Sequence, residues 1–102
     1  MALPDGLLED AKKYLEITWS DSDTDSKLSG MLSRGIIYLD RLAGKANDYT
    51  QESAARELLF TRVRYERAGA LADFDNDYRS LIRAFEDDAL VENEVVDYET
   101  TE

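Results

Sequence analysis

Hydrophobic residues recur along most of the chain at the spacing of helices that bury one face. The first such stripe consists of Leu7, Leu8, Ala11, Tyr14, Leu15 and Thr18. The second consists of Leu28, Met31, Leu32, Gly35, Ile36, Leu39 and Leu42. Pro4 and Asp5 are a start signal for the first helix, and Gly44 is a left-handed stop for the second. The pattern predicts two helices, separated by a Ser- and Asp-rich turn at 20–26.

Two further stripes follow. A long helix is predicted from about Gln51 to Ala70, capped by Asp48 or Thr50, with Ala55, Leu58, Leu59, Val63 and Tyr65 as its buried side. A fourth helix is indicated by Tyr78, Leu81, Ile82 and Phe85, followed by Ala89. No segment alternates as a strand would, so the predicted fold is all-α, a small bundle of about four helices.

Composition narrows the possible functions of this 102-residue chain, which is one domain by length. Cysteine and histidine are both absent, which removes disulfides, thiolate metal sites and the commonest general base. Neither an activated nucleophile nor a glycine-rich phosphate loop is recognisable, so we expect no enzymatic activity and no cofactor. No apolar run approaches the roughly 20 residues that span a bilayer, and the start does not resemble a signal peptide.

The net charge of −11 is concentrated at the C-terminal end. Residues 86–102 hold eight acids and no base, whereas residues 41–85 hold seven acids and eight bases. The same end carries Leu90, Val91, Val95, Val96 and Tyr98, which a purely solvating tail does not need. We therefore predict a helical domain at 1–88 and an acidic arm at 89–102 that is mobile in the free chain and orders on a partner, where it could be added as a strand.

Two aspartate clusters have the spacing that begins an EF-hand calcium loop: Asp21, Asp23 and Asp25, and Asp73, Asp75 and Asp77. Both lack the glycine at the sixth position and the glutamate at the twelfth, which are replaced by Ser26 and Leu32 in the first cluster and by Tyr78 and Ala84 in the second. We expect instead that each cluster caps the helix after it.

Six arginines of the second half are interleaved with acids, and the isoelectric point near 4.3 argues against a nucleic-acid surface. Most of them should make surface pairs such as Glu52 with Arg56, although some guanidinium groups could meet carboxylates of another subunit. Trp19 fits either an interface anchor or a part of the core.

The order of these segments resembles the head-tail connector family of tailed bacteriophages, and within it the head completion adaptors of Bacillus siphophages. The resemblance runs through Leu7-Leu8-Glu9-Asp10-Ala11-Lys12-Lys13-Tyr14-Leu15, the acidic turn, Ile36-Ile37-Tyr38-Leu39, Leu58-Leu59-Phe60, Tyr65-Glu66-Arg67 and Tyr78-Arg79-Ser80-Leu81-Ile82. It implies an all-α virion protein without chemistry of its own. The long acidic C-terminal extension departs from many relatives.

The resemblance implies a structural role in the virion, after assembly in the host cytoplasm. Adaptors of this family form a ring, about twelve-fold, on the portal protein, extend the DNA channel, and offer a platform to a stopper or tail-completion protein. DNA would pass without sequence-specific binding, and free subunits would be monomers. Arg79 and Arg83 would meet portal carboxylates, while Leu81 and Ile82 pack. Further candidate interface residues are Phe85, Val91, Val95, Val96 and Tyr98.

Two other classes of function stay open. A small acidic helical protein can mimic DNA in the basic groove of a nuclease or repressor, which requires carboxylates spaced along a folded face. The poor helix signals near Asn93 and Thr100 speak against such a face. A regulatory, calcium-responsive module is the second alternative.

Overall fold

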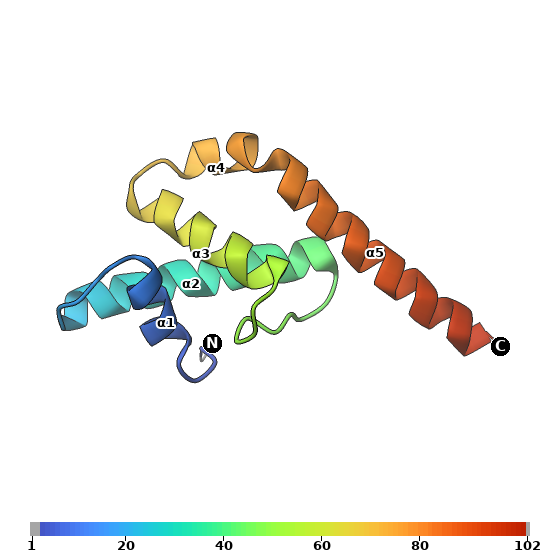
Figure 1. The fold of residues 1–102 in the computed structure, drawn as a ribbon, viewed down its shortest axis with the longest axis horizontal. Coiled ribbons are helices and arrows are strands. Elements are labelled where there is room, and N and C mark those ends of the chain that lie inside the picture. Colours follow the sequence, from blue (N-terminus) through green and yellow to red (C-terminus); the bar gives the residue numbers. More distant parts are fainter. Residues whose placement is uncertain (1–2, 102) are drawn as a thin grey trace.

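The computed structural model describes the backbone of residues 3–101 and the side chains of residues 3–91. Along this backbone the chain forms five helices and no strand: α1 (Leu7–Tyr14), α2 (Ser22–Ala43), α3 (Ala54–Arg67), α4 (Leu71–Asp77) and α5 (Arg79–Thr101). The predicted all-α class is confirmed. Helices α1 to α4 gather into one body, and α5 descends past the end of α2 and extends beyond it (Figure 1).

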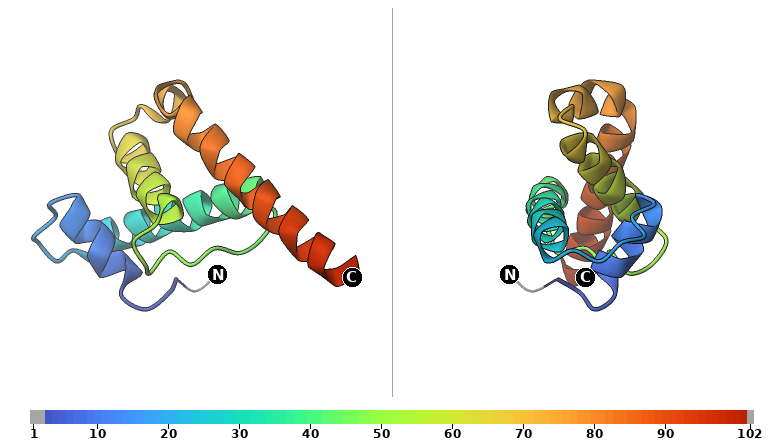
Figure 2. Two further views of the ribbon diagram at one scale, coloured as in Figure 1. Left: turned by 45° about the vertical axis from the view of Figure 1, so that its right-hand side comes forward. Right: turned by 90° about the vertical axis from the view of Figure 1, so that its left-hand side faces the viewer.

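The centre of the body is the contact between α2 and α3, the most extensive in the fold. Leu32 and Leu39 of α2 and Leu59 and Val63 of α3 are completely buried there. Gly35 lets the two helices approach closely, because a methyl group added at its Cα would lie 2.5 Å from Leu59 Cδ1. The left-hand view of Figure 2 shows α3 and α5 crossing α2.

The first two helices differ from their predicted ends. Helix α1 stops at Tyr14, since the chain turns at Glu16, where φ is 61°, before Ile17 returns to the core. Helix α2 starts at Ser22, so most of the predicted turn at 20–26 is helical. Its cap is Asp21, whose carboxylate accepts hydrogen bonds from the amide and hydroxyl of Thr24 at 3.3 and 2.8 Å. The capping role predicted for this acidic cluster is thus confirmed at Asp21.

Helix α3 is shorter than predicted at both ends. Ser53 is its N-cap, accepting a hydrogen bond from the amide of Arg56 at 3.2 Å. Neither Asp48 nor Thr50 caps it, because the two bond to each other: Thr50 donates its amide and its hydroxyl to Asp48 Oδ1 at 2.9 and 2.6 Å. Gly69, with φ of 74°, turns the chain after α3.

The second aspartate cluster lies within α4 and does not cap the helix after it, so that prediction was wrong. Tyr38 of α2 donates a hydrogen bond to Asp75 at 3.1 Å, and Tyr65 of α3 donates one to Asp77 at 2.8 Å. Between these bonds Phe74 is buried, with its ring 5.9 Å from that of Tyr65. The cluster therefore fastens α4 to the body.

Helix α5 continues through the predicted boundary at residue 88 and as far as Thr101. Residues 79–101 contain neither glycine nor proline, so nothing in the backbone interrupts the helix. The backbone near Asn93 and Thr100 is thus helical despite the weak helix signals there. The addition of the arm to a partner as a strand stays a prediction. The mobility of the arm in the free chain stays a prediction. None of the helices in the described part of the chain is long and apolar enough to cross a membrane.

Candidate docking surface

Arg79 and Arg83 lie on the first turns of α5, beside the end of α2. They line a hollow together with Tyr38, Leu42, Asp75, Ile82 and Glu86. Arg79 donates a hydrogen bond to Asn76 Oδ1 at 2.9 Å, and Arg83 has no side-chain partner among residues 3–91. Both guanidinium groups are exposed, as recognition of an external carboxylate requires. Asp75 and Glu86 share the hollow, so its charge is balanced and not strongly basic.

The apolar residues of α5 that are buried and those that are exposed differ from the prediction. Ile82 is buried as expected, but Leu81 is 52% exposed and does not pack in the core. Phe85, predicted at an interface, is only 8% exposed and belongs to the core. The reason is rotational: Tyr78, Ile82, Phe85 and Ala89 follow the side of α5 that faces the body, and Leu81 lies at its edge.

Beyond Phe85 the described part of α5 presents apolar side chains to solvent. Leu90 and Val91 are 59% and 57% exposed, whereas Ala89 is buried. Val91 is thus accessible, and its interface role stays a prediction. The backbone at Val95, Val96 and Tyr98 is helical, but their side chains lie outside the described residues.

A groove with an apolar floor runs between α3 and α5. Leu58, Thr61 and Phe85 form its floor, and its walls include Leu81, Glu57 and Asp88. We call this feature the α3–α5 groove. Glu57 and Asp88 form no ion pair or hydrogen bond with the side chains of residues 3–91. The sequence indicated its apolar residues only as core, because the pattern of one helix does not show how a second helix lies beside it.

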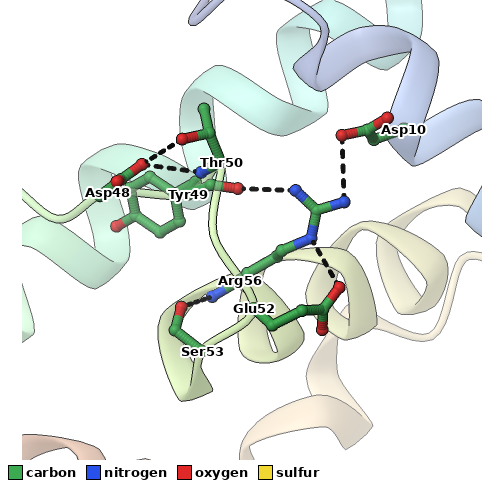
Figure 3. Close-up of polar contacts among 7 residues, drawn as sticks. All are labelled: Asp10, Asp48, Tyr49, Thr50, Glu52, Ser53 and Arg56. Atoms are coloured by element: carbon green, nitrogen blue, oxygen red, sulfur yellow. Dashed lines mark hydrogen bonds and ion pairs between the residues drawn. The ribbon is translucent and has the colours of Figure 1, made fainter.

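Arg56 was predicted to form a surface pair, but its guanidinium connects separate segments within the body (Figure 3). Its guanidinium donates to the carbonyl of Tyr49 at 3.0 Å and to Asp10 of α1 at 3.1 Å, and it stacks 4.8 Å from the ring centre of Phe60. The predicted partner Glu52 is farther away at 3.7 Å and 98% exposed. Arg56 therefore connects α1, the loop before α3 and α3 itself.

A second internal network joins α2 to α3. Glu66 accepts from Arg34 at 2.6 and 3.0 Å and lies 3.4 Å from Arg62. Arg62 also lies over the ring of Tyr38, 4.9 Å from its centre. Arg34, Arg56 and Arg62 are thus satisfied within the body, whereas Arg41, Arg67 and Arg83 have no side-chain partner in the region described.

The largest pKa shifts in this region belong to three tyrosines that donate hydrogen bonds to aspartates. Burial and the bond to Asp75 raise the pKa of Tyr38 to about 12. The bond to Asp77, with a smaller contribution from desolvation, raises the pKa of Tyr65 to about 12. Burial and the nearby Asp40 also raise the pKa of Tyr49. These phenols are held protonated at neutral pH and act as hydrogen-bond donors.

Metal binding has no support in the region where side chains are described. No three acidic side chains converge there on a position that a cation could occupy. In the first cluster Asp21 caps α2, and its bonds to Thr24 lower its pKa. Asp25 Oδ1 lies 3.0 Å from the buried ammonium of Lys12 and forms an ion pair with it. Trp19, between α1 and α2, is 49% exposed and lies outside the core.

The arrangement defines a helical protein with exposed apolar side chains at Leu81, Leu90 and Val91 of α5. Comparison of the chain with protein-family models, with curated proteins and with solved structures finds no match.

Proposed function

We propose that this chain is a structural adaptor of a phage head-tail connector, a virion protein without catalytic activity that assembles as a ring on the portal. The observation that carries the proposal is the division of the molecule (Figure 1): a closed helical body, and a helix that extends from it with unpaired acids and exposed apolar side chains. Such a helix is typical of an element that docks on a neighbour. The resemblance of segment order adds the identity of the neighbour.

The acidic character suits a channel component. A wall with excess negative charge repels DNA and lets it slide without sequence-specific contact. Arg79 and Arg83, on the turns of α5 nearest the body, supply positive groups that can meet portal carboxylates. In this proposal α5 and its arginines face the portal, and the opposite end of the body receives the stopper or tail-completion protein.

Co-sedimentation with the purified portal protein tests the proposal, with bare DNA and an unrelated ring protein as controls. We expect binding to the portal alone. Replacing Arg79 and Arg83 by Glu should abolish binding while the circular dichroism of the free chain stays unchanged. The matched control reverses Arg64 and Arg67, which are also exposed and lie on α3, and should bind normally. Equal binding by both double variants would place the docking surface elsewhere.

The role of the arm is tested by a chain that ends at Asp88. We expect this truncated chain to fold but to assemble weakly on the portal, because it lacks Val91, Val95, Val96 and Tyr98. Hydrogen exchange on the full chain should show amides of 89–102 that are slow only in the assembled ring. Full assembly by the truncated chain would show that the arm is dispensable.

A DNA mimic is the second candidate, and one observation favours it. Because α5 is helical to Thr101, its carboxylates lie on a regular scaffold, which the sequence reading had not expected. Inhibition of a panel of nucleases and repressors at low salt, lost when residues 89–102 are removed, would support the mimic. Binding to the portal without any such inhibition would support the adaptor.

A further inference from the structure

The α3–α5 groove has the properties of a receptor for a side chain from outside. Its hollow measures about 70 Å³, several times the roughly 10–15 Å³ that one water needs and suited to one aliphatic side chain. Leu58 and Phe85 are buried in its floor, and Leu81 on its wall is half exposed. Glu57 and Asp88 stand beside it without partners among residues 3–91. The groove therefore suits an apolar side chain accompanied by positive charge.

A matching feature lies on the outer face of α2. The buried residues of this helix include Leu32, Ile36 and Leu39, and at 100° per residue Ile37 and Arg41 fall on the side away from them. Ile37 is 46% exposed. Arg41, one turn later, is exposed and has no side-chain partner in the described region. We call Ile37 and Arg41 the α2 knob.

We propose that the α2 knob of one copy inserts into the α3–α5 groove of a second copy, with Ile37 in the hollow and Arg41 near Glu57 or Asp88. This inference rests on the proposed function and specifies the contact between neighbours in the ring. Knob and groove are different surfaces of one chain, so the contact is heterologous, and repeating it generates a closed ring or an open helix.

Charge favours a second copy as the occupant. Residues 1–85 carry fifteen acids and twelve bases, so the bodies repel each other only weakly. The remaining eight acids lie in 86–102, mostly on the part of α5 that extends away from the body (Figure 2). Local attraction between Arg41 and the groove acids can therefore outweigh the net repulsion at high protein concentration as well as on the portal.

Engineered cysteines test the contact directly, since the native chain has none. One batch carries Ile37→Cys and the other Leu81→Cys; they are mixed at high concentration and treated with a short bismaleimide. We expect mainly the mixed pair, several-fold above the pair formed by Leu81→Cys with Trp19→Cys, a control of similar exposure. A mixed yield no higher than this control, or a dominant Ile37-to-Ile37 product, overturns the proposal.

Charge reversal gives a second readout in the same assay, with folding checked by circular dichroism. Added to the cysteine variants, Arg41→Glu alone or Asp88→Arg alone should lower the mixed yield several-fold. The two reversals together restore opposite charges and should recover it. No recovery by the double reversal overturns the pairing of Arg41 with Asp88. The assay uses no portal, so it can fail while the portal-binding test of the adaptor function succeeds, and the reverse.

Discussion

The body and α5 differ in whether their charged side chains have partners within the chain. In the body, Arg56 meets Asp10, Arg34 meets Glu66 and Lys12 meets Asp25, so ionic groups join helices to one another. In the described part of α5, Arg83 and Asp88 have no side-chain partner. The body thus uses most of its arginines and their acidic partners for its own fold, with Arg41 and Glu57 among the exceptions, whereas Arg83 and Asp88 of α5 stay available to another molecule. Stability and recognition are therefore expected to respond to different substitutions.

The largest expected difference between the body and α5 is in the free energy of unfolding that is lost when a hydrophobic side chain is truncated. Leu59→Ala removes a fully buried side chain at the crossing of α2 and α3 and should lower the free energy of unfolding by about 2–5 kcal/mol. Leu90→Ala, on an exposed position of α5, should change it by less than about 0.5 kcal/mol. Urea denaturation measures both. Similar losses would show that α5 is part of the cooperative core at Leu90.

Arginine substitutions should also cost more stability in the body than in α5, with a smaller difference in the free energy of unfolding. Arg56→Met leaves the Tyr49 carbonyl without its donor and should cost about 1–3 kcal/mol of unfolding free energy. Arg83→Met removes a guanidinium without a described partner and should have little effect on stability. The same denaturation experiment compares them, with Glu52→Gln as a check that the exposed partner of Arg56 contributes little. A loss from Glu52→Gln equal to that from Arg56→Met would contradict the internal role of Arg56.

The hydrophobic periodicity predicted most of the buried residues within each helix of the body. It did not predict the residues that are buried by contact with a neighbouring element. Five leucines that were predicted to be buried are buried: Leu28, Leu32, Leu39, Leu58 and Leu59. Apolar residues at helical spacing lie on one face of a helix, and that face leaves water only by packing against other helices. Phe60 and Phe74 are also buried but were not predicted. Each lies off the main stripe of its own segment and is covered by a neighbouring element, which single-helix periodicity does not describe.

The candidate surface was predicted less well, for a related reason. The exposure of Arg79 and Arg83 follows from their place beside the stripe of α5, and the sequence indicated it. Leu81 and Phe85 exchanged roles, because the two occupy the same predicted stripe and the rotation of α5 about its own axis decides which one is covered. Ser53 was missed as a cap because Asp48 and Thr50, better placed by pattern, bond to each other.

Alkaline titration tests whether the aspartates of α4 fasten it to the body. The pKa of Tyr38 is raised to about 12, so the folded chain holds this proton more tightly than the unfolded chain. The corresponding stability is complete below pH 10 and declines as the pH approaches 12. Asp75→Asn should move the Tyr38 phenolate absorbance toward pH 10. Asp73→Asn, whose carboxylate accepts no tyrosine hydrogen bond in the described region, is the control and should leave the titration unchanged.

The smallest expected effect concerns the end of α5 and its response to salt. Asp88 with Glu92, and Glu94 with Asp97, are like charges one helical turn apart, and acids near a helix C-terminus oppose the dipole. Salt screens both effects, so raising the ionic strength should increase the far-UV helical signal of the full chain by the equivalent of a few residues. A chain ending at Val91 lacks most of these acids and should show no such increase, since its remaining helices are held by buried contacts. An equal response from both chains would place the salt-sensitive helix in the body and would remove the electrostatic distinction between the body and α5.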